Sequence, residues 1–135
     1  MNQYCFVDTS FFKAFADSKD DFHTRALQIF RKSKETKLHL VTSNYILDET
    51  FTVIRSKCGL AVVKQFKTIL EEFEEDLKIV RVLIGDEVNA WHFFLNDWSN
   101  LSFTDCVSFV QMKRLEIKTV LAFDDHFRRA GFEII

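Results

Sequence analysis

Four acidic side chains lie within or next to predicted secondary-structure elements, and carboxylates bind hard metal ions. Asp8 follows the apolar run Tyr4–Val7, which is typical of a buried strand, and precedes the hydroxyl residues Thr9 and Ser10. We therefore expect Asp8 at the carboxyl end of a central strand, where open α/β sheets bind their ligands. Thr9 and Ser10 are expected to cap a helix that begins at Phe11. The other three acids are Glu49, Asp105 and Asp124.

The three remaining acids are expected to approach Asp8 from different elements. Glu49 lies within a helix that begins after Thr42–Asn44, Asp105 opens an apolar helix, and Asp124 follows a predicted strand. Parallel strands end at the same edge of a sheet, so these carboxylates can converge there. Like charges a few ångströms apart raise one another's pKa values, and a bound Mg²⁺ or Mn²⁺ removes that conflict. Such an ion activates water and stabilises the charge of a phosphate displacement.

Each acid also has a purely structural interpretation. Asp105 could favour a helix N-terminus through the helix dipole, Asp124 could form a turn, and Glu49 could be a solvated helix position. Their joint placement at one sheet edge favours a shared site instead. His126 could serve as a general base, but a surface histidine in a turn is the preferred interpretation, because water activated by a metal needs no such base.

Apolar periodicity predicts a chain that alternates strands and helices. After the first strand, the expected strands are Leu38–Val41, Leu77–Val82, Thr119–Phe123 and Phe132–Ile135. The expected helices are Phe11–Ala16, Asp20–Lys32, a third that ends near Lys57, Leu60–Phe73, Asp86–Leu95 and Thr104–Leu115. Strands separated by helices imply right-handed crossovers and a parallel sheet covered on both faces. The predicted fold class is α/β, a three-layer α/β/α sandwich, in one domain over residues 1–135.

Composition narrows the class of protein further. The formal net charge of −2 argues against a protein that holds nucleic acid by bulk positive charge. The 16 phenylalanines predict a core packed with aromatic rings. Cys5, Cys58 and Cys106 form neither a zinc pattern nor a disulfide framework, so we expect reduced thiols. We find neither a signal peptide pattern nor an apolar run of membrane-spanning length, and expect a cytoplasmic protein.

The four acidic segments, taken in order, resemble the motifs of the PIN domain family, which includes many small metal-dependent ribonucleases. The matching segments are Val7–Ser10, Ser43–Glu49, Leu101–Asp105 and Leu121–Phe127, with Gly131–Ile135 as the closing strand. The family pattern for the fourth segment is a hydroxyl residue, any residue, Asp, any two residues and Phe. This pattern places the acid at Asp124. Many members carry Thr or Ser where this chain has Ala122.

The resemblance implies an endoribonuclease that acts on structured RNA, commonly tRNA or ribosomal RNA. Small PIN proteins of this size are mostly toxins of the VapC type. The resemblance therefore also implies a toxin–antitoxin pair, a homodimer and an antitoxin whose tail covers the active site. On this basis Asp8, Glu49 and Asp105 would hold the principal Mg²⁺ or Mn²⁺, and Asp124 would complete the site. Thr9 or Ser10 would hold a carboxylate in place through a hydrogen bond.

Basic and aromatic residues offer candidate RNA contacts. The candidate phosphate-binding residues are Lys13, Lys19, Arg55, Lys57, Arg128 and Arg129. Aromatic side chains at Trp91, Phe93, Phe94 and Trp98 could stack on bases, but core packing or a subunit contact is the preferred interpretation. The Phe-rich faces of the second and fourth helices could form an antitoxin groove.

Two other classes of protein compete with a ribonuclease. A haloacid-dehalogenase-type phosphatase needs a second Asp two residues after Asp8, where this chain has Ser10. The other alternative is a PIN-like RNA- or protein-binding module without catalysis. The presence of all four acids favours the enzyme over that module.

Overall fold

Strands and helices alternate along residues 3–135, the part of the chain that the computed structural model describes. Residues 1 and 2 of the predicted domain lie outside this part. The strands are β1 (Tyr4–Val7), β2 (His39–Ser43), β3 (Leu77–Val80), β4 (Thr119–Leu121) and β5 (Glu133–Ile134). The helices are α1 (Thr9–Ala16), α2 (His23–Glu35), α3 (Asn44–Cys58), α4 (Leu60–Glu72), α5 (Ile84–Phe94), α6 (Phe103–Arg114) and α7 (His126–Arg129).

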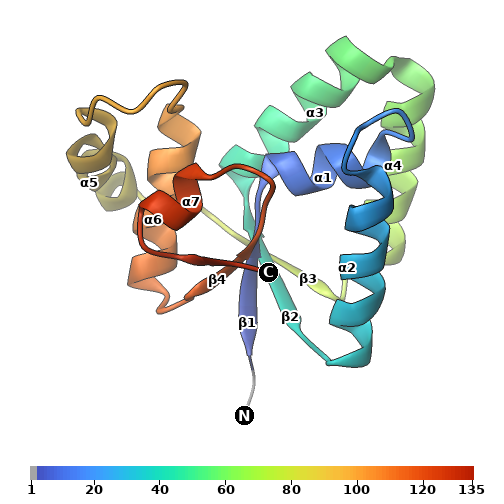
Figure 1. Cartoon of the computed structure of the whole chain (residues 1–135), viewed down its shortest axis with the longest axis horizontal. Coiled ribbons are helices and arrows are strands. Elements are labelled where there is room, and N and C mark those ends of the chain that lie inside the picture. Colours follow the sequence, from blue (N-terminus) through green and yellow to red (C-terminus); the bar gives the residue numbers. More distant parts are fainter. Residues whose placement is uncertain (1–2) are drawn as a thin grey trace.

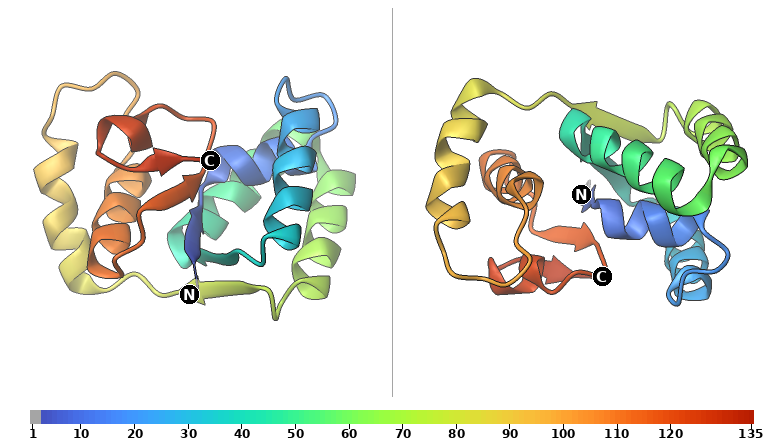
Figure 2. Two further views of the ribbon diagram at one scale, coloured as in Figure 1. Left: turned by 60° about the horizontal axis from the view of Figure 1, so that its bottom comes forward. Right: turned by 90° about the horizontal axis from the view of Figure 1, so that it is seen from above.

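The strands form one parallel sheet in the order β3-β2-β1-β4-β5, so β1 lies in the middle. Phe6 of β1 pairs with Val41 of β2 on one side and with Val120 of β4 on the other. Helices α1 to α4 lie on one side of the sheet, and α5, α6 and the short α7 lie on the other (Figures 1 and 2). A central strand covered on both faces must be apolar, which explains the buried run Cys5–Val7. The predicted α/β/α sandwich with a parallel sheet is confirmed.

Aromatic rings fill much of the core, as the composition predicted. Phe6, Phe66, Phe109 and Phe127 are fully buried. The Phe109 ring packs edge-on against Phe127, with a centroid distance of 5.0 Å. Burial of one such side chain contributes about 1.5–3 kcal/mol to stability. These contacts hold α6 and α7 against each other beside the sheet.

Helix α1 begins two residues earlier than predicted, and the reason lies in Asp8. We expected Thr9 and Ser10 to cap a helix starting at Phe11, but this expectation is wrong. The Asp8 side chain accepts the backbone N–H of Ser10 and is itself the N-cap, so the helix starts at Thr9. The strand β1 therefore leads into α1 through a single residue, and that residue is acidic.

Two further local signals position the third helix. The Ser43 hydroxyl accepts the backbone N–H of Ile46 at 3.1 Å, so Ser43 caps α3 directly after β2 ends. Gly59 separates α3 from α4 with a φ of 88°, a conformation that favours glycine. Both predicted signals are confirmed, and they place Glu49 in the second turn of α3 above the carboxyl edge of the sheet.

The remaining boundaries agree with the expectations or differ from them by up to three residues. Helix α2 begins at His23 and not at Asp20, because Asp20 accepts the backbone N–H of Phe22 in the preceding loop. Within residues 3–135 we find no helix long and apolar enough to span a membrane. In the same part of the chain Cys5, Cys58 and Cys106 are free thiols, as expected.

Candidate active site

Asp8 is a buried carboxylate with one bonded oxygen and one free oxygen. Its Oδ2 accepts hydrogen bonds from the Ser10 backbone N–H at 3.1 Å and from the Ser10 hydroxyl at 2.7 Å. Its Oδ1 is buried and meets no hydrogen-bond donor within the described residues. Burial and then the charge of Asp105 raise the pKa of Asp8 to about 7, although the Ser10 bonds oppose this shift. A buried carboxylate oxygen without a partner is a position that a cation would satisfy.

Asp105 lies across from Asp8 at the first turn of α6. Ser102 and Asp105 form a capping box, in which the Asp105 N–H donates to the Ser102 hydroxyl at 3.0 Å. The same geometry fixes the Asp105 carboxylate at the carboxyl edge of the sheet. Burial and then the charge of Asp124 raise the pKa of Asp105 to about 6. Asp105 therefore caps the N-terminus of α6, and it also belongs to the acid cluster.

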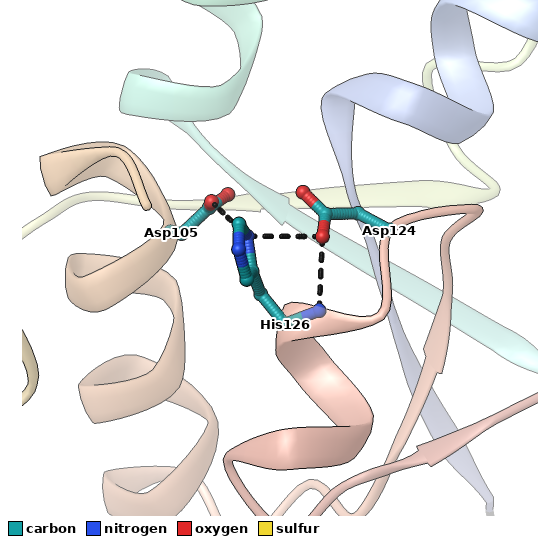
Figure 3. A group of neighbouring side chains, drawn as sticks. All are labelled: Asp105, Asp124 and His126. Atoms are coloured by element: carbon teal, nitrogen blue, oxygen red, sulfur yellow. Dashed lines mark hydrogen bonds and ion pairs between the residues drawn. The ribbon is translucent and has the colours of Figure 1, made fainter. Parts of the chain in front are cut away.

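Asp124 follows β4 and meets Asp105 through a histidine (Figure 3). The backbone N–H of His126 donates to Asp124 Oδ1 at 2.9 Å. The imidazole Nδ1 of His126 lies 3.0 Å from Asp124 Oδ1 and 3.3 Å from Asp105 Oδ2. Potential ligand atoms of these three side chains all lie within 4.8 Å of one another.

His126 is not the surface histidine of a turn that the sequence analysis preferred. Its side chain is largely buried, and its Nε2 lies 2.8 Å from the carbonyl oxygen of Ser99. A carbonyl can only accept a hydrogen bond and carboxylates accept when ionised, so both ring nitrogens act as donors in the imidazolium form. Burial alone would lower the pKa of His126, but the Ser99 carbonyl, Asp124 and Asp105 outweigh it and raise the pKa. The raised pKa favours the imidazolium form of His126, whose positive charge would offset part of the charge of the two acids.

The four predicted acids line one open hollow of about 610 Å³. Glu49, half-buried on α3, reaches it from the opposite side to α6, and its charge also raises the pKa values of Asp8 and Asp105. Asp8 and Glu49 stand outside the tight group of Asp105, Asp124 and His126. Asp48, the neighbour of Glu49, is exposed and does not line the hollow. The side chains of the four acids thus share one space at the carboxyl edge of the sheet.

The donor atoms of this hollow suit a hard divalent cation. Four carboxylates supply oxygen ligands, and the free Oδ1 of Asp8 is a buried position for one of them. Mg²⁺ typically takes one or two carboxylates and keeps several waters, which an open hollow allows. The pKa values of Asp8 and Asp105 are raised first by burial and then by the neighbouring acids, and a bound cation would oppose both effects.

The two hydroxyl residues after Asp8 have different roles. Ser10 holds the Asp8 carboxylate, as one of the two alternatives predicted. Thr9 does not, because its hydroxyl donates to the carbonyl oxygen of Ile46 at 3.4 Å and so joins α1 to α3. The Thr50 hydroxyl in turn donates to the Thr9 hydroxyl at 3.3 Å. Thr9 thus fixes the helix that carries Glu49, which is an indirect contribution to the site.

Of the six candidate phosphate-binding residues, two line the hollow. Lys13 lines it, but its ammonium group is already paired with Asp17 at 2.9 Å and with Asp20 at 2.8 Å. Lys57 at the end of α3 is the second. The other four, Lys19, Arg55, Arg128 and Arg129, are not among its lining residues.

Two further residues of the hollow were not predicted from the sequence. Asn100 and Ser102 also line the hollow, from the loop between α5 and α6. The Ser-x-x-Asp spacing of Ser102 and Asp105 is a capping-box signature, so Ser102 could have been found. Asn100 sits at a φ of 60° in an irregular loop, and no signal in the sequence indicates its position.

Comparisons with known proteins agree with this geometry. The PIN domain family model matches residues 5–133. A 23S rRNA-specific endonuclease of Mycobacterium tuberculosis, VapC20, is 30% identical to this chain over 128 residues, which cover 94% of each protein; the sequences from two strains match equally. The crystal structure of M. tuberculosis VapC20, described as a sarcin–ricin loop cleaving toxin, has a TM-score of 0.80 at 29% identity and covers 95% of each chain. These matches confirm the resemblance that the four motifs indicated, and the chain belongs to the PIN domain family.

Proposed function

We propose that the protein is a metal-dependent endoribonuclease that hydrolyses RNA phosphodiester bonds. The observation that carries this proposal is the convergence of Asp8, Glu49, Asp105 and Asp124 on one hollow at the carboxyl edge of the sheet. The endonuclease activity of the relative VapC20, which matches this chain almost end to end, supports the same conclusion. The haloacid-dehalogenase alternative has no support, since Ser10 holds Asp8 where that chemistry needs a second acid.

Each acid has a role in this proposal. Asp8, Glu49 and Asp105 would hold a Mg²⁺ or Mn²⁺ ion, directly or through water, and Asp124 would complete the site. Such an ion supplies an activated water and neutralises the charge that develops on the phosphate. Ser10 orients Asp8 so that its free oxygen is available as a ligand. His126 orients Asp105 and Asp124 and offsets part of their charge when no ion is bound.

We further propose that the substrate is a structured RNA, with ribosomal RNA favoured over tRNA. The relative VapC20 is specific for 23S rRNA and is described as cleaving the sarcin–ricin loop. The open shape of the hollow suits a loop that protrudes from a folded RNA. Such a substrate would place the protein in the cytoplasm.

The proposed activity would need an inhibitor, and an apolar cavity offers a site for one. This cavity, of about 360 Å³, lies among α1, α2 and α4 and is lined by phenylalanines of all three helices. Phe11 lines the cavity and also stacks on Phe123, which lines the acidic hollow. We place the tail of a small antitoxin protein here, because a chain anchored in the cavity would reach the acids past these two rings. This protein would then be the toxin of a type II pair.

A homodimer is the assembly we propose, with α5 as its contact surface. Ile84, Val88, Trp91 and Leu95 follow one another at spacings of four, three and four, and all four are exposed. The exposed positions of this helix carry no Asp, Glu, Lys or Arg. In a two-fold interface a surface patch packs against the same patch of the partner, so a patch without charge avoids like-charge repulsion. An RNA partner would instead require basic groups there.

The direct test of the ribonuclease is cleavage of bacterial ribosomal RNA by the purified protein with Mn²⁺ and with EDTA. We expect discrete cuts with Mn²⁺ and none with EDTA. Asp8→Asn should abolish cleavage and weaken Mn²⁺ binding, while the control Asp48→Asn, an exposed acid on α3, should leave both unchanged. Equal Mn²⁺ binding by wild type and Asp8→Asn would show that the catalytic assignment is wrong, and it would favour the binding module without catalysis.

A further inference from the structure

Phe22 presents an aromatic ring to solvent at the rim of the acidic hollow. Phe22 is 49% exposed, although phenylalanine is usually buried. One face of the ring stacks on Phe123, with a centroid distance of 4.6 Å and an interplanar angle of 7°. Phe123 also lies nearly parallel to the buried Phe11, at 6.0 Å and 12°. Phe22 is therefore the outer ring of a stack that is anchored in the core.

The loop that carries Phe22 is held in place by several bonds. The Phe22 N–H donates to Asp20 Oδ1 at 2.8 Å, and its carbonyl accepts the Ala26 N–H at 2.8 Å in the first turn of α2. Lys13 of α1 pairs with Asp20 and with Asp17, so the loop is tied to the helix that follows Asp8. The ring position is thus fixed before any ligand arrives. A fixed aromatic surface loses little conformational entropy when a ligand stacks on it.

The position of this ring relative to the acids limits what can bind it. Phe22 and Phe123 line the same hollow as Asp8 and Asp124, and Phe123 is the residue directly before Asp124. A nucleotide that flanks a phosphate held at the acids would therefore lie in the hollow that the Phe22 ring also lines. Unpaired bases stack on aromatic side chains, whereas paired bases inside a duplex cannot reach them.

We propose that the exposed face of Phe22 stacks on an unpaired nucleobase that flanks the phosphate to be cut. This inference rests on the proposed ribonuclease function and adds a substrate feature to it, namely an unstacked nucleotide beside the scissile bond. Stacking accepts every base because each has a π-face, so Phe22 selects unpaired structure and not a sequence. The ring takes no part in the chemistry, and its contribution is equal before and during the reaction.

The test compares Phe22→Leu, Phe22→Tyr and the control Phe51→Leu with the wild type, on an RNA hairpin that contains the mapped cut. Phe51 is a matched control because it is an exposed phenylalanine that does not line the hollow. Stacking on one base contributes about 1–3 kcal/mol to binding. We therefore expect Phe22→Leu to raise KM roughly 5- to 100-fold and to leave kcat nearly unchanged. Phe22→Tyr, which keeps the ring, should restore the wild-type KM, and Phe51→Leu should not alter it.

A second measurement separates stacking from a structural role. 2-Aminopurine placed beside the cut should lose fluorescence on binding wild type or Phe22→Tyr, and should lose much less on binding Phe22→Leu. Mn²⁺ affinity reports the folded acid site and should be the same in all variants. A normal KM and full quenching in Phe22→Leu would overturn the inference while the ribonuclease stands. Absence of any Mn²⁺-dependent cut by the wild type would overturn the proposed function, and this inference with it.

Discussion

The hydroxyl of Ser10 donates a hydrogen bond of 2.7 Å to Asp8 Oδ2. The Ser10 hydroxyl oxygen also accepts the backbone N–H of Phe123 at 2.9 Å, so Ser10 joins the segment after β4 to Asp8. One side chain thus orients the central acid and fixes the segment that leads to Asp124. Because this chain has Ala122 two residues before Asp124, that position supplies no hydroxyl, and Ser10 makes both of these bonds.

Replacement of Ser10 should therefore weaken metal binding without unfolding the protein. Ser10→Ala removes the hydroxyl bond that lowers the pKa of Asp8, so that pKa should rise further and protons should compete better with the ion. Loss of such an orienting partner typically costs about 10- to 100-fold in metal affinity. Calorimetric titration with Mn²⁺ at pH 7 measures the effect. Ser56→Ala, which removes an exposed hydroxyl from α3, is the control and should bind Mn²⁺ like the wild type.

Removal of the central charge should stabilise the protein in the absence of metal. Burial and Asp105 make the ionised Asp8 unfavourable, so Asp8→Asn should raise the metal-free melting temperature by about 2–5 °C. The same variant should gain no further stability from Mn²⁺, whereas the wild type should gain several degrees. Differential scanning calorimetry with EDTA and with Mn²⁺ measures both effects. A lower metal-free melting temperature for Asp8→Asn would contradict the like-charge conflict at this site.

The acid cluster should make metal-free stability fall as pH rises. The folded pKa values of Asp8 and Asp105, about 7 and about 6, lie above the ordinary value of 3.8. Between about pH 4 and pH 7 the folded protein therefore keeps protons that the unfolded chain has released. Stability from this source is present below pH 4 and is lost by pH 7. Urea unfolding with EDTA measures the trend, and Asp8→Asn should reduce its slope.

Much of this site could be predicted because local signals fix it. Asp8 ends an apolar strand, and Asp105 lies three residues after Ser102 in a capping box, so both positions follow from short segments. The environment of His126 could not be predicted in this way. It depends on where the loop with Ser99 passes α7, which is a long-range contact between elements 27 residues apart. The start of α1 was misplaced for a local reason, since an acid at a strand end can also be a helix cap.

A buried ion pair should hold α5 against α6, independently of the acid cluster. Arg114 Nε and Nη2 donate to the two oxygens of the buried Asp86, each at 2.8 Å. Burial acts to raise the pKa of Asp86, but Arg114 and the Leu83 N–H outweigh it and lower the pKa. Arg114→Met would leave the carboxylate buried and unpaired, at a cost of roughly 2–4 kcal/mol after allowance for the partly exposed Arg114.

The pair predicts a pH dependence opposite in sign to that of the acid cluster. Because the folded pKa of Asp86 is lowered, its stabilisation is present above the ordinary value of 3.8 and is lost as pH falls below it. Urea unfolding at pH 7 and at pH 3 should show that Arg114→Met costs less at the lower pH. The double variant Asp86→Asn, Arg114→Met should recover part of the loss at pH 7, since no unpaired charge remains.

A lysine in the apolar stripe of α5 should separate the proposed dimer. Val88 is 63% exposed, so Val88→Lys can be accommodated in the monomer. In a two-fold contact, the two lysines would face each other or be desolvated together, and either raises the dissociation constant. Sedimentation equilibrium should give a dimer for the wild type and for Gln65→Lys, an exposed control on α4, and a monomer for Val88→Lys. The melting temperature of Val88→Lys at low protein concentration should stay near that of the wild type, since both are then monomers. A Val88→Lys protein that remains dimeric would exclude α5 as the contact surface, and a monomeric wild type would exclude the dimer itself.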